Sequence, residues 1–424
     1  MAPSTPTRRS FLKSILAAGV APLVLPARLF GANAPSKQIT MGFIGVGVHG
    51  RRVNLTSFLS EPDCRVLAVC DAYFDRRQIA RKDVNARYGN TDCTTIADFR
   101  DLLARDDLDA VAISTPDHWH VPMTEMALDA GKMVFCEKPT LTIDEGRRLA
   151  NRVKRTGAVF CTGLEDRSVM HYFMMAQAVR NGAIGELKHI QVGLPAKPIY
   201  AHQDPAPLPP GFDFNMWLGP APERDYTPQL TDPQVWRQIR DFSGGSLTDW
   251  GAHLIDTAQV GNFSEHTTPV SVSGRGVIPP DSINTVPQTY TIDYTYANGV
   301  TMQVVSDQPS IRFEGTEGWV GNTGWRGKLE ASDMEIYRRE YEPAADRIWP
   351  RPRTEHRNFL DVAKGEAEPI YDAESLHQLS TVMHMGAISM ELNRPLKWNP
   401  KKERFNKRQA NALRSRKSRQ WSRA

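Results

Sequence analysis

Short apolar runs alternate with helical patterns through the first third of the chain. Five runs have the length of a buried strand and lie at 39–44, 65–69, 109–114, 133–136 and 159–162. Apolar residues recur at helical spacing between several of them, at 98–104, 121–130 and 142–156. In the last of these, Thr142 and Glu145 form a capping box, and Gly157 follows the helix. This alternation of strand and helix predicts a parallel, doubly wound α/β sheet.

The pattern changes in the second half of the chain. Helical spacing occurs at 172–181, 247–260 and 373–392, and strand-like alternation at 187–194, 270–277, 289–296 and 300–306. The sequence Ala297-Asn298-Gly299 joins the last two strands and is a strong hairpin signal. We therefore expect an α+β domain with a mainly antiparallel sheet. The proline-rich stretch 195–222 has no regular pattern and predicts a long surface loop.

A glycine motif directly follows the first apolar run. Gly45, Gly47 and Gly50 form G-x-G-x-x-G, with His49 inside it, and Asp71 ends the second run 21 residues later. Glycine at these positions permits a tight turn, close approach of a pyrophosphate to the backbone, and close packing of the next helix on the strand. An acid after the second strand accepts hydrogen bonds from the adenosine ribose. The motif, its flanks and the acid together predict a dinucleotide site.

The choice between the two nicotinamide dinucleotides depends on the same acid. Asp71 favours NAD, because a carboxylate repels the 2′-phosphate of NADP. Arg76 and Arg77 follow closely and are suited to a 2′-phosphate, so NADP stays possible. The sequence favours NAD.

Polar and aromatic residues follow two further predicted strands. Ligands of open α/β sheets bind at the carboxyl ends of the strands, so these residues are expected to face the cofactor. The candidates are Thr115, Pro116, His118, Trp119, His120, Glu137 and Lys138. We expect Trp119 to stack on the nicotinamide or on a sugar face, and Lys138 to lie near the nicotinamide. A surface lysine is the competing interpretation of Lys138.

A second candidate group lies in the predicted helix 247–260. Asp249 and His253 are four residues apart and would share one helical face, so the acid could orient the ring and the histidine could act as a general base. Such a pair is also often structural. Metal ligation is an alternative, but no third or fourth ligand follows at convincing spacing, and no metal is expected. Glu165 and Arg167, after the last strand of the first sheet, are weaker candidates for the site.

Composition adds two constraints. The five cysteines form no C-x-x-C pair and are expected to be buried free thiols. The formal net charge is +4, and the basic excess is local: residues 401–424 hold ten Lys or Arg and one acid. We therefore expect no nucleic-acid partner.

The N-terminal residues have the form of an export signal. Thr7-Arg8-Arg9-Ser10-Phe11-Leu12-Lys13 fits a twin-arginine motif and is followed by an apolar stretch at 15–30 and by Ala32-Asn33-Ala34. A chance Arg-Arg pair is the alternative. The interpretation predicts recognition by the twin-arginine export machinery and a periplasmic or secreted protein.

These motifs together resemble the Gfo/Idh/MocA oxidoreductases, NAD(P)-dependent enzymes of sugars and polyols. The most specific marks are Glu137-Lys138-Pro139 and the Asp-x-x-x-His of Asp249 and His253. The resemblance implies that Lys138 binds the reacting hydroxyl, that His253 is the general base and that Asp249 holds the substrate. From its position after the last strand, Arg167 is added as a candidate substrate contact. It also implies a homo-oligomer, a dimer or tetramer, and a packed C-terminal segment.

The resulting organisation has four parts. They are a signal at 1–34, an NAD(P)-binding Rossmann domain at 35–162, a substrate and oligomerisation domain at 163–400 and a basic segment at 401–424. Two activities fit the resemblance: a dehydrogenase acting on a carbohydrate, and a glycosidase that oxidises, eliminates, adds water and reduces again on one bound NAD. A nucleotide-binding scaffold without catalysis is the third reading, and Lys138, Asp249 and His253 argue against it.

Overall fold

The computed structural model describes residues 38–341 and 351–421. Contacts within the chain group residues 39–424 into one compact unit, and the description that follows concerns this unit. The predicted twin-arginine signal at 1–34 lies outside the described residues. None of the helices in the described ranges is long and apolar enough to cross a membrane.

The first sheet has the predicted parallel arrangement. Its six strands have the order β3-β2-β1-β4-β5-β6, and every neighbouring pair is parallel. The strands are β1 (Ile39–Ile44), β2 (Cys64–Cys70), β3 (Thr94–Ile96), β4 (Ala110–Ile113), β5 (Met133–Glu137) and β6 (Phe160–Gly163). The three-residue strand β3 was not predicted. The order reverses between β1 and β4, where an open α/β sheet forms its ligand crevice.

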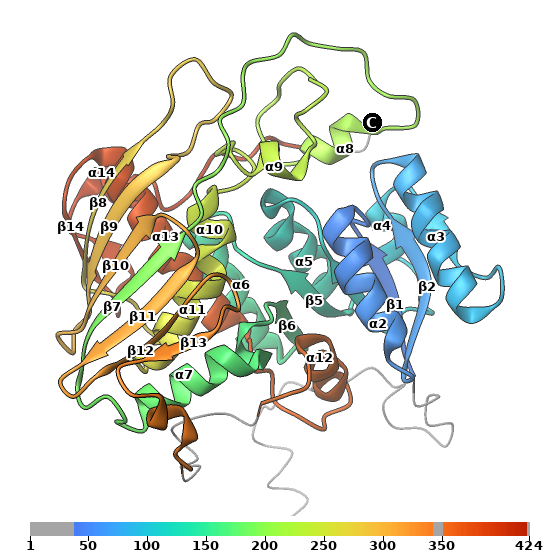
Figure 1. Cartoon of the computed structure of the whole chain (residues 1–424). Coiled ribbons are helices and arrows are strands. Elements are labelled where there is room, and N and C mark those ends of the chain that lie inside the picture. The colour runs from blue at the N-terminus through green and yellow to red at the C-terminus, as the bar shows by residue number, and fades with distance from the viewer. Residues whose placement is uncertain (1–37, 342–350, 422–424) are drawn as a thin grey trace, which may run out of the picture. The chain divides into compact units, whose positions relative to one another are not determined.

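Helices connect these strands much as the pattern predicts (Figure 1). They are the π-helix η2 (Gly50–Leu55), α2 (Thr56–Ser60), α3 (Phe74–Tyr88), α4 (Phe99–Leu103), α5 (His120–Asp129) and α6 (Ile143–Thr156). The side chain of Thr142 accepts the backbone N–H of Glu145, and Gly157 ends α6 in the left-handed region, so the predicted caps of this helix are confirmed.

The second sheet is larger than predicted and mixed. Its nine strands have the order β13-β12-β11-β7-β10-β9-β8-β14-β15. They are β7 (Leu187–Leu194), β8 (Ser271–Val277), β9 (Thr289–Thr295), β10 (Thr301–Ser306), β11 (Ser310–Gly315), β12 (Trp319–Thr323), β13 (Leu329–Ala331), β14 (Leu396–Asn399) and β15 (Arg404–Phe405). The predicted hairpin joins β9 to β10, and only the β7–β10 pair is parallel among the described pairings of this sheet. The expected mainly antiparallel sheet is confirmed.

Three helices cover the buried face of this sheet (Figure 1). They are α7 (Met170–Arg180), α11 (Gly251–Gly261) and α13 (Ala373–Leu392). Strand β9 shows why one face is buried: its residues alternate between exposed and buried along all seven positions.

Two later segments return to the first sheet. Helix α12 (Glu355–Ala363) contacts α2 and β6, and its Phe359 ring packs edge-on against Phe58 and Phe135. The basic segment folds into β15 and α14 (Arg408–Ala412), after which Arg414 pairs with Asp144 of α6. Residues far beyond 162 therefore pack against the first domain, so the two domains share contacts across the predicted boundary.

The predicted helix at 247–260 is interrupted. Helix α10 (Ser246–Asp249) ends before Trp250, and α11 begins at Gly251. Asp249 and His253 therefore belong to different helices, which corrects the expectation that they share one helical face.

Candidate functional site

A cavity of about 710 Å³ opens at the carboxyl ends of β1, β4 and β5. One end is lined by the glycine motif, Asp71 and Arg76, and the other by Lys138, Lys197, Arg237, Asp249 and His253. We call these the nucleotide end and the substrate end. Residues from both halves of the chain line this one cavity.

Each glycine of the motif meets a different geometric requirement. Gly45 has a φ of 83°, in the left-handed region, and a Cβ there would lie 2.6 Å from the carbonyl oxygen of Ser114. A Cβ on Gly50 would collide with the carbonyl oxygen of Gly45. A Cβ on Gly47 would meet only Arg76, at 3.6 Å, and Gly47 lines the cavity. The backbone at Gly47 is thus open to a ligand, as a pyrophosphate requires.

Asp71 is fixed by the backbone around the nucleotide end. Its carboxylate accepts the N–H groups of Val46 and Tyr73, both at 2.9 Å. Burial raises the pKa of Asp71, against the positive charge of Arg76. Each oxygen makes one backbone hydrogen bond and keeps a lone pair, so the carboxylate could still accept ribose hydroxyls from within the cavity.

His49 and Glu137 form a polar group beside the nucleotide end. Nε2 of His49 lies 2.9 Å from Oε1 of Glu137, which also accepts a hydrogen bond from Asn54 at 2.9 Å. Burial opposes ionisation of Glu137, but His49 and Lys138 outweigh it and lower its pKa to about 2. The charge of Glu137 in turn raises the pKa of His49. The pair connects the glycine loop to the end of β5.

Lys138 projects from the end of β5 to the substrate end. The Lys138–Pro139 peptide bond is cis. Nζ of Lys138 donates to the backbone carbonyl of Asp249 at 2.8 Å and lies 3.3 Å from its Oδ1. Burial lowers the pKa of this lysine, but Asp249 and Glu137 more than compensate and raise it. Lys138 is therefore a charged hydrogen-bond donor at the cavity.

Asp249 is surrounded by cations. Oδ1 lies 3.3 Å from Nζ of Lys138 and 3.3 Å from Nε of Arg237, and Oδ2 lies 3.9 Å from Nζ of Lys197. Burial disfavours the carboxylate, but the three cations hold the pKa of Asp249 well below its usual range. Asp249 is ionised and cannot act as a general acid near neutral pH.

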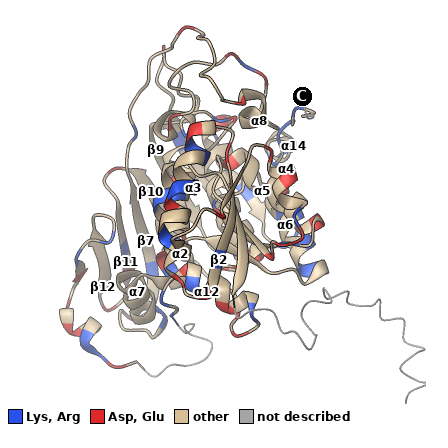
Figure 2. Cartoon of the chain, turned by 90° about the vertical axis from the view of Figure 1, so that its right-hand side faces the viewer, with Lys and Arg blue, Asp and Glu red and all other residues tan. Residues whose placement is uncertain are grey.

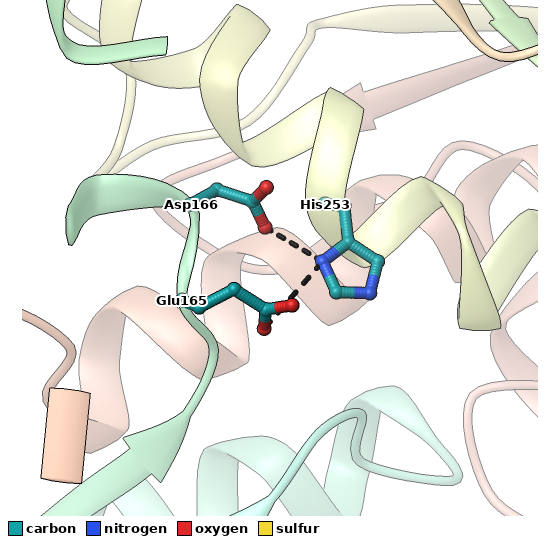
Figure 3. Close-up of side chains that lie close together, drawn as sticks. All are labelled: Glu165, Asp166 and His253. Atoms are coloured by element: carbon teal, nitrogen blue, oxygen red, sulfur yellow. Dashed lines mark hydrogen bonds and ion pairs between the residues drawn. The ribbon is translucent and has the colours of Figure 1, made fainter. Parts of the chain in front are cut away.

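His253 is held by Asp166 and not by Asp249 (Figure 3). Nδ1 of His253 lies 2.6 Å from Oδ2 of the buried Asp166, and no hydrogen bond or ion pair between the side chains of Asp249 and His253 occurs in the described part of the chain. Burial lowers the pKa of His253, but Asp166 reverses this and raises it. With Nδ1–H donated to the carboxylate, Nε2 is left to accept a proton. Asp166, which follows the last strand of the first sheet, was not predicted as a site residue.

Glu165 lies beside Asp166 and faces the same nitrogen of the His253 ring (Figure 3). One of its oxygens is 3.9 Å from Nδ1 of His253, and the other accepts a hydrogen bond from Arg326 at 2.8 Å. Glu165, Asp166 and His253 have ligand atoms within 4.8 Å of one another, a spacing that could hold a metal ion. Glu165 and His253 were predicted separately as site candidates, but their grouping with Asp166 was not, because 87 residues separate Asp166 from His253.

Four of the predicted site residues that follow β4 line the cavity. They are Thr115, Pro116, Trp119 and His120. The Trp119 indole donates to the carbonyl of Met216 at 3.1 Å, and its ring packs edge-on against Phe99. Both ring nitrogens of His120 lie 2.9 Å from backbone carbonyl oxygens. These rings form a fixed wall of the cavity.

Two expected site residues lie outside the cavity lining. His118 is fully buried, and its Nε2 lies 3.0 Å from the carbonyl oxygen of Trp217. Arg167 forms a buried ion pair with Asp256 at 2.8 Å and lies over the ring of Tyr371. We correct both expectations: neither side chain is placed to contact a ligand, because each faces a core formed by segments distant in sequence.

Three tryptophans at the substrate end were not predicted. Trp236, Trp250 and Trp325 line the cavity, and Trp325 is 39% exposed. The ring of Trp325 packs edge-on against Trp250, at 5.4 Å between centroids, and lies 5.6 Å from the ring of His253. Tryptophan presents a large apolar face with one polar edge, which suits the C–H faces of a sugar ring.

Comparison with known families covers most of the described chain. Residues 39–164 match the NAD-binding Rossmann fold of the Gfo/Idh/MocA oxidoreductase family, and residues 198–423 match the C-terminal alpha/beta domain of that family.

Curated relatives share only part of their length with this chain. A "Glycosyl hydrolase family 109 protein" of Shewanella baltica (strain OS185) is 34% identical over 187 residues, which are 42% of this chain and 39% of the relative. Another of that description, from Shewanella sp. (strain W3-18-1), is 32% identical over 169 residues, 38% of this chain and 36% of the relative. The matches thus span well under half of the relatives' length.

Solved structures are similar in fold. The aldose-aldose oxidoreductase of Caulobacter crescentus, complexed with glycerol, aligns with a TM-score of 0.60 and 20% identity, over 85% of this chain and 99% of that one. The WlbA dehydrogenase of Bordetella pertussis, in complex with NADH and UDP-GlcNAcA, aligns with a TM-score of 0.63 and 15% identity over the same shares.

Proposed function

The chain belongs to the Gfo/Idh/MocA oxidoreductase family, and on this premise we propose that it oxidises a secondary hydroxyl of a sugar, polyol or glycoside with NAD. The observation that carries the proposal is the substrate end of the cavity. There a charged lysine shares the cavity with the glycine motif and with a histidine whose Nε2 has no hydrogen bond within the described residues. The three tryptophans favour a carbohydrate as the substrate.

The nucleotide end fits NAD. The backbone at Gly47 is open to the cavity, and the fixed carboxylate of Asp71 is placed for the ribose hydroxyls and against a 2′-phosphate. Arg76 also lines this end, so NADP stays a weaker possibility.

The chain's own groups move the proton. Bound NAD supplies a hydride acceptor at C4 of the nicotinamide. Nε2 of His253 accepts the proton of the reacting hydroxyl, and Asp166 stabilises the imidazolium that forms. The Nζ–H groups of Lys138 hold the same oxygen and stabilise its developing negative charge. Asp249, which stays ionised, positions Lys138 and accepts hydroxyls of the substrate.

Two substitutions test this assignment. We expect Lys138→Met and His253→Asn each to lower kcat by about 100-fold or more, because each removes a group that acts in the transition state. The measurement is NADH formation at 340 nm across a panel of sugars and polyols, with NAD binding measured separately. An exposed-residue control, Lys328→Met, should behave like the wild type. Full turnover by either site variant would refute the assignment.

A second activity is supported by the curated relatives, which are described as glycosyl hydrolases of family 109. In this alternative the same residues would hold the substrate and move its protons. Bound NAD would take a hydride from a ring carbon and return it after the aglycone has been eliminated and water has added in its place. The test is release of nitrophenol from nitrophenyl glycosides without net formation of NADH. Release that requires bound NAD but leaves the absorbance at 340 nm unchanged would favour the glycosidase.

Export and assembly complete the proposal. The twin-arginine motif at 7–13 supports transport by the twin-arginine machinery to the periplasm or beyond. Replacing Arg8 and Arg9 by lysine should leave the protein in the cytoplasm, as cell fractionation would show.

The family resemblance supports a homo-oligomer, and light scattering of the purified protein should give the mass of a dimer or tetramer. On the face of the molecule that Figure 2 turns toward the viewer, acidic and basic residues are interspersed along the helices. This distribution gives no support to a nucleic-acid partner.

A further inference from the structure

Three cations at the substrate end share the carboxylate of Asp249. Its oxygens lie 3.3 Å from Lys138, 3.9 Å from Lys197 and 3.3 Å from Arg237. Lys138 alone accounts for the contact that the proposed reaction requires. The reaction therefore does not explain the other two cations, Lys197 and Arg237.

Of these two cations, Lys197 has fewer polar partners. Its side chain is 13% exposed, yet within the described residues Nζ has no hydrogen bond. Its neighbours are Oδ2 of Asp249 at 3.9 Å and the face of the Trp250 ring, 5.2 Å from Nζ. Burial lowers the pKa of Lys197 more than Asp249 raises it. A mostly buried ammonium group with this little compensation is costly for the protein, so the position is suited to a charged partner from the cavity.

Arg237 also keeps a donor free. Nε lies 3.3 Å from Oδ1 of Asp249, and Nη1 donates to the carbonyl oxygen of Pro233 at 2.9 Å. The guanidinium lies over the Trp236 ring, 4.5 Å from its centroid, and Nη2 has no hydrogen-bond partner in the described part of the chain. The ring and Asp249 hold the guanidinium in place without using all of its donors.

Two nearby acids have partners of their own. Asp166 is bonded to His253, and Glu165 is bonded to Arg326. Neither forms a hydrogen bond or ion pair with Lys197 or Arg237 in the described part of the chain. The cofactor phosphates belong at the glycine motif, so they are not the expected partner of these two cations.

We propose that Lys197 and Arg237 form an anion-binding subsite, and that the substrate is a carbohydrate carrying a carboxylate, phosphate or sulfate group. This inference rests on the proposed function, since it concerns the substrate of the same site. Charge-assisted hydrogen bonds from a lysine and an arginine recognise all three groups, and the planar arginine donors match a carboxylate especially well.

Binding measurements separate this inference from catalysis. The probes are D-glucuronate and D-galacturonate, their neutral methyl esters, and D-glucose 6-phosphate and 6-sulfate, each titrated calorimetrically into the protein saturated with NADH. We expect at least one anion to bind about 10-fold or more tighter than its neutral counterpart, with an affinity that falls as salt is added. Which anion binds best identifies the carboxylate, phosphate or sulfate.

Variants that remove one charge each test whether Lys197 and Arg237 cause the preference for an anionic ligand. Lys197→Met and Arg237→Gln should each reduce binding of the preferred anion by about 10-fold or more, reduce binding of the neutral probe much less, and leave binding of NADH unchanged. The control is Lys188→Met, which removes an exposed lysine paired with Glu186 on the surface of β7. Equal affinity for anionic and neutral probes, or an equal loss of both in the variants, would overturn the inference. Anion binding without any turnover would instead count against the proposed reaction alone.

Discussion

At the scale of single residues, the state of His253 depends on Asp166. The carboxylate receives Nδ1–H at 2.6 Å and raises the pKa of the imidazole against the effect of burial. We expect Asp166→Asn to lower kcat/KM by about 100-fold or more, because the neutral amide neither fixes the tautomer nor stabilises the imidazolium. Steady-state kinetics would measure this, with the exposed Asp204→Asn as the control.

The pH profile distinguishes this role from a structural one. His253 acts as a base when neutral, so activity rises with pH through its pKa, which lies above the ordinary value of about 6.5. Removing the Asp166 charge leaves burial as the main influence, and burial lowers the pKa. The acid limb of kcat/KM should therefore move to lower pH in Asp166→Asn. An unmoved limb with reduced activity would indicate a purely structural effect.

Cofactor choice is also a property of one residue. Asp71→Ser removes the carboxylate that opposes a 2′-phosphate, while Arg76 remains at the same end of the cavity. We expect the ratio of kcat/KM for NAD to that for NADP to fall by about 10-fold or more. Asp75→Ser, an exposed position in the first turn of α3, is the matched control and should keep the ratio. A variant that loses activity with both cofactors alike would contradict the proposed role.

The sequence could identify only residues whose chemistry is visible locally. Gly45, Asp71 and Lys138 each stand at the end of a predicted strand, and this position places them at the crevice whatever the rest of the chain does. The partners of His253 and Asp249 are different, because Asp166, Lys197 and Arg237 come from other segments. The loop that carries Lys197 has no periodicity, so nothing in the pattern aims this lysine into the cavity.

At the scale of elements, regular periodicity predicted the long helices and strands well, whereas several short elements were not predicted. The helix at 373–392 and the strand at 187–194 have the predicted bounds. The break at Trp250 was not predicted, because the apolar spacing runs through it without interruption. Strands β11 to β13 were missed, since their alternation is short and interrupted by polar residues.

The C-terminal segment is the element with the most direct connection to the cavity. Arg419 donates to the carbonyl oxygen of Gly219 at 3.0 Å and to the side chain of Asn215 at 2.9 Å, which ties the segment to α8 (Phe214–Leu218). The ring of Trp421 packs edge-on against Trp119, at 5.1 Å between centroids, and Trp119 lines the cavity. The expectation that this basic segment is packed is confirmed.

Removing the Trp421 ring should therefore affect both stability and cofactor binding. We expect Trp421→Ala to lower the free energy of unfolding by about 1–3 kcal/mol, through lost aromatic contact with Trp119 and Phe99. The Kd for NAD should rise, because both partner rings line the nucleotide cavity. Chemical denaturation and calorimetric titration measure the two effects. Lys417→Ala, an exposed change in the same segment, should alter neither.

At the scale of the whole molecule, the two halves are interlocked. Helix α12 lies near the end of the chain but packs on the first sheet, where Phe359 joins the core that contains Phe58 and Phe135. The division into 35–162 and 163–400 followed the change in periodicity, which records local structure and carries no information about where a late helix returns. We therefore expect both halves to unfold together, in one transition by fluorescence and circular dichroism.

Arg357 offers a sharp test of this interlocking. From α12 it pairs with Glu61 at 2.9 Å and with Asp63 at 2.8 Å, nearly 300 positions earlier in the chain. All three side chains are less than one-fifth exposed, so Arg357→Met leaves two carboxylates with much less compensation. We expect the free energy of unfolding to fall by about 3–5 kcal/mol near neutral pH. Arg338→Met, which breaks an exposed pair with Glu335, should cost less than about 0.5 kcal/mol.

The effect of Arg357→Met should depend on pH with a definite sign. The Arg357 hydrogen bond is the largest influence on Asp63, and with Lys364 it holds the pKa of this carboxyl well below its usual range of about 3.9. A group with a lowered folded-state pKa stabilises the protein above its unfolded pKa, and that stabilisation disappears as the pH falls toward the folded value. The difference between wild type and variant should therefore be largest above about pH 5 and shrink below about pH 4. Urea denaturation at several pH values measures it, and a difference that grows on acidification would show that the ion pair does not join the two halves.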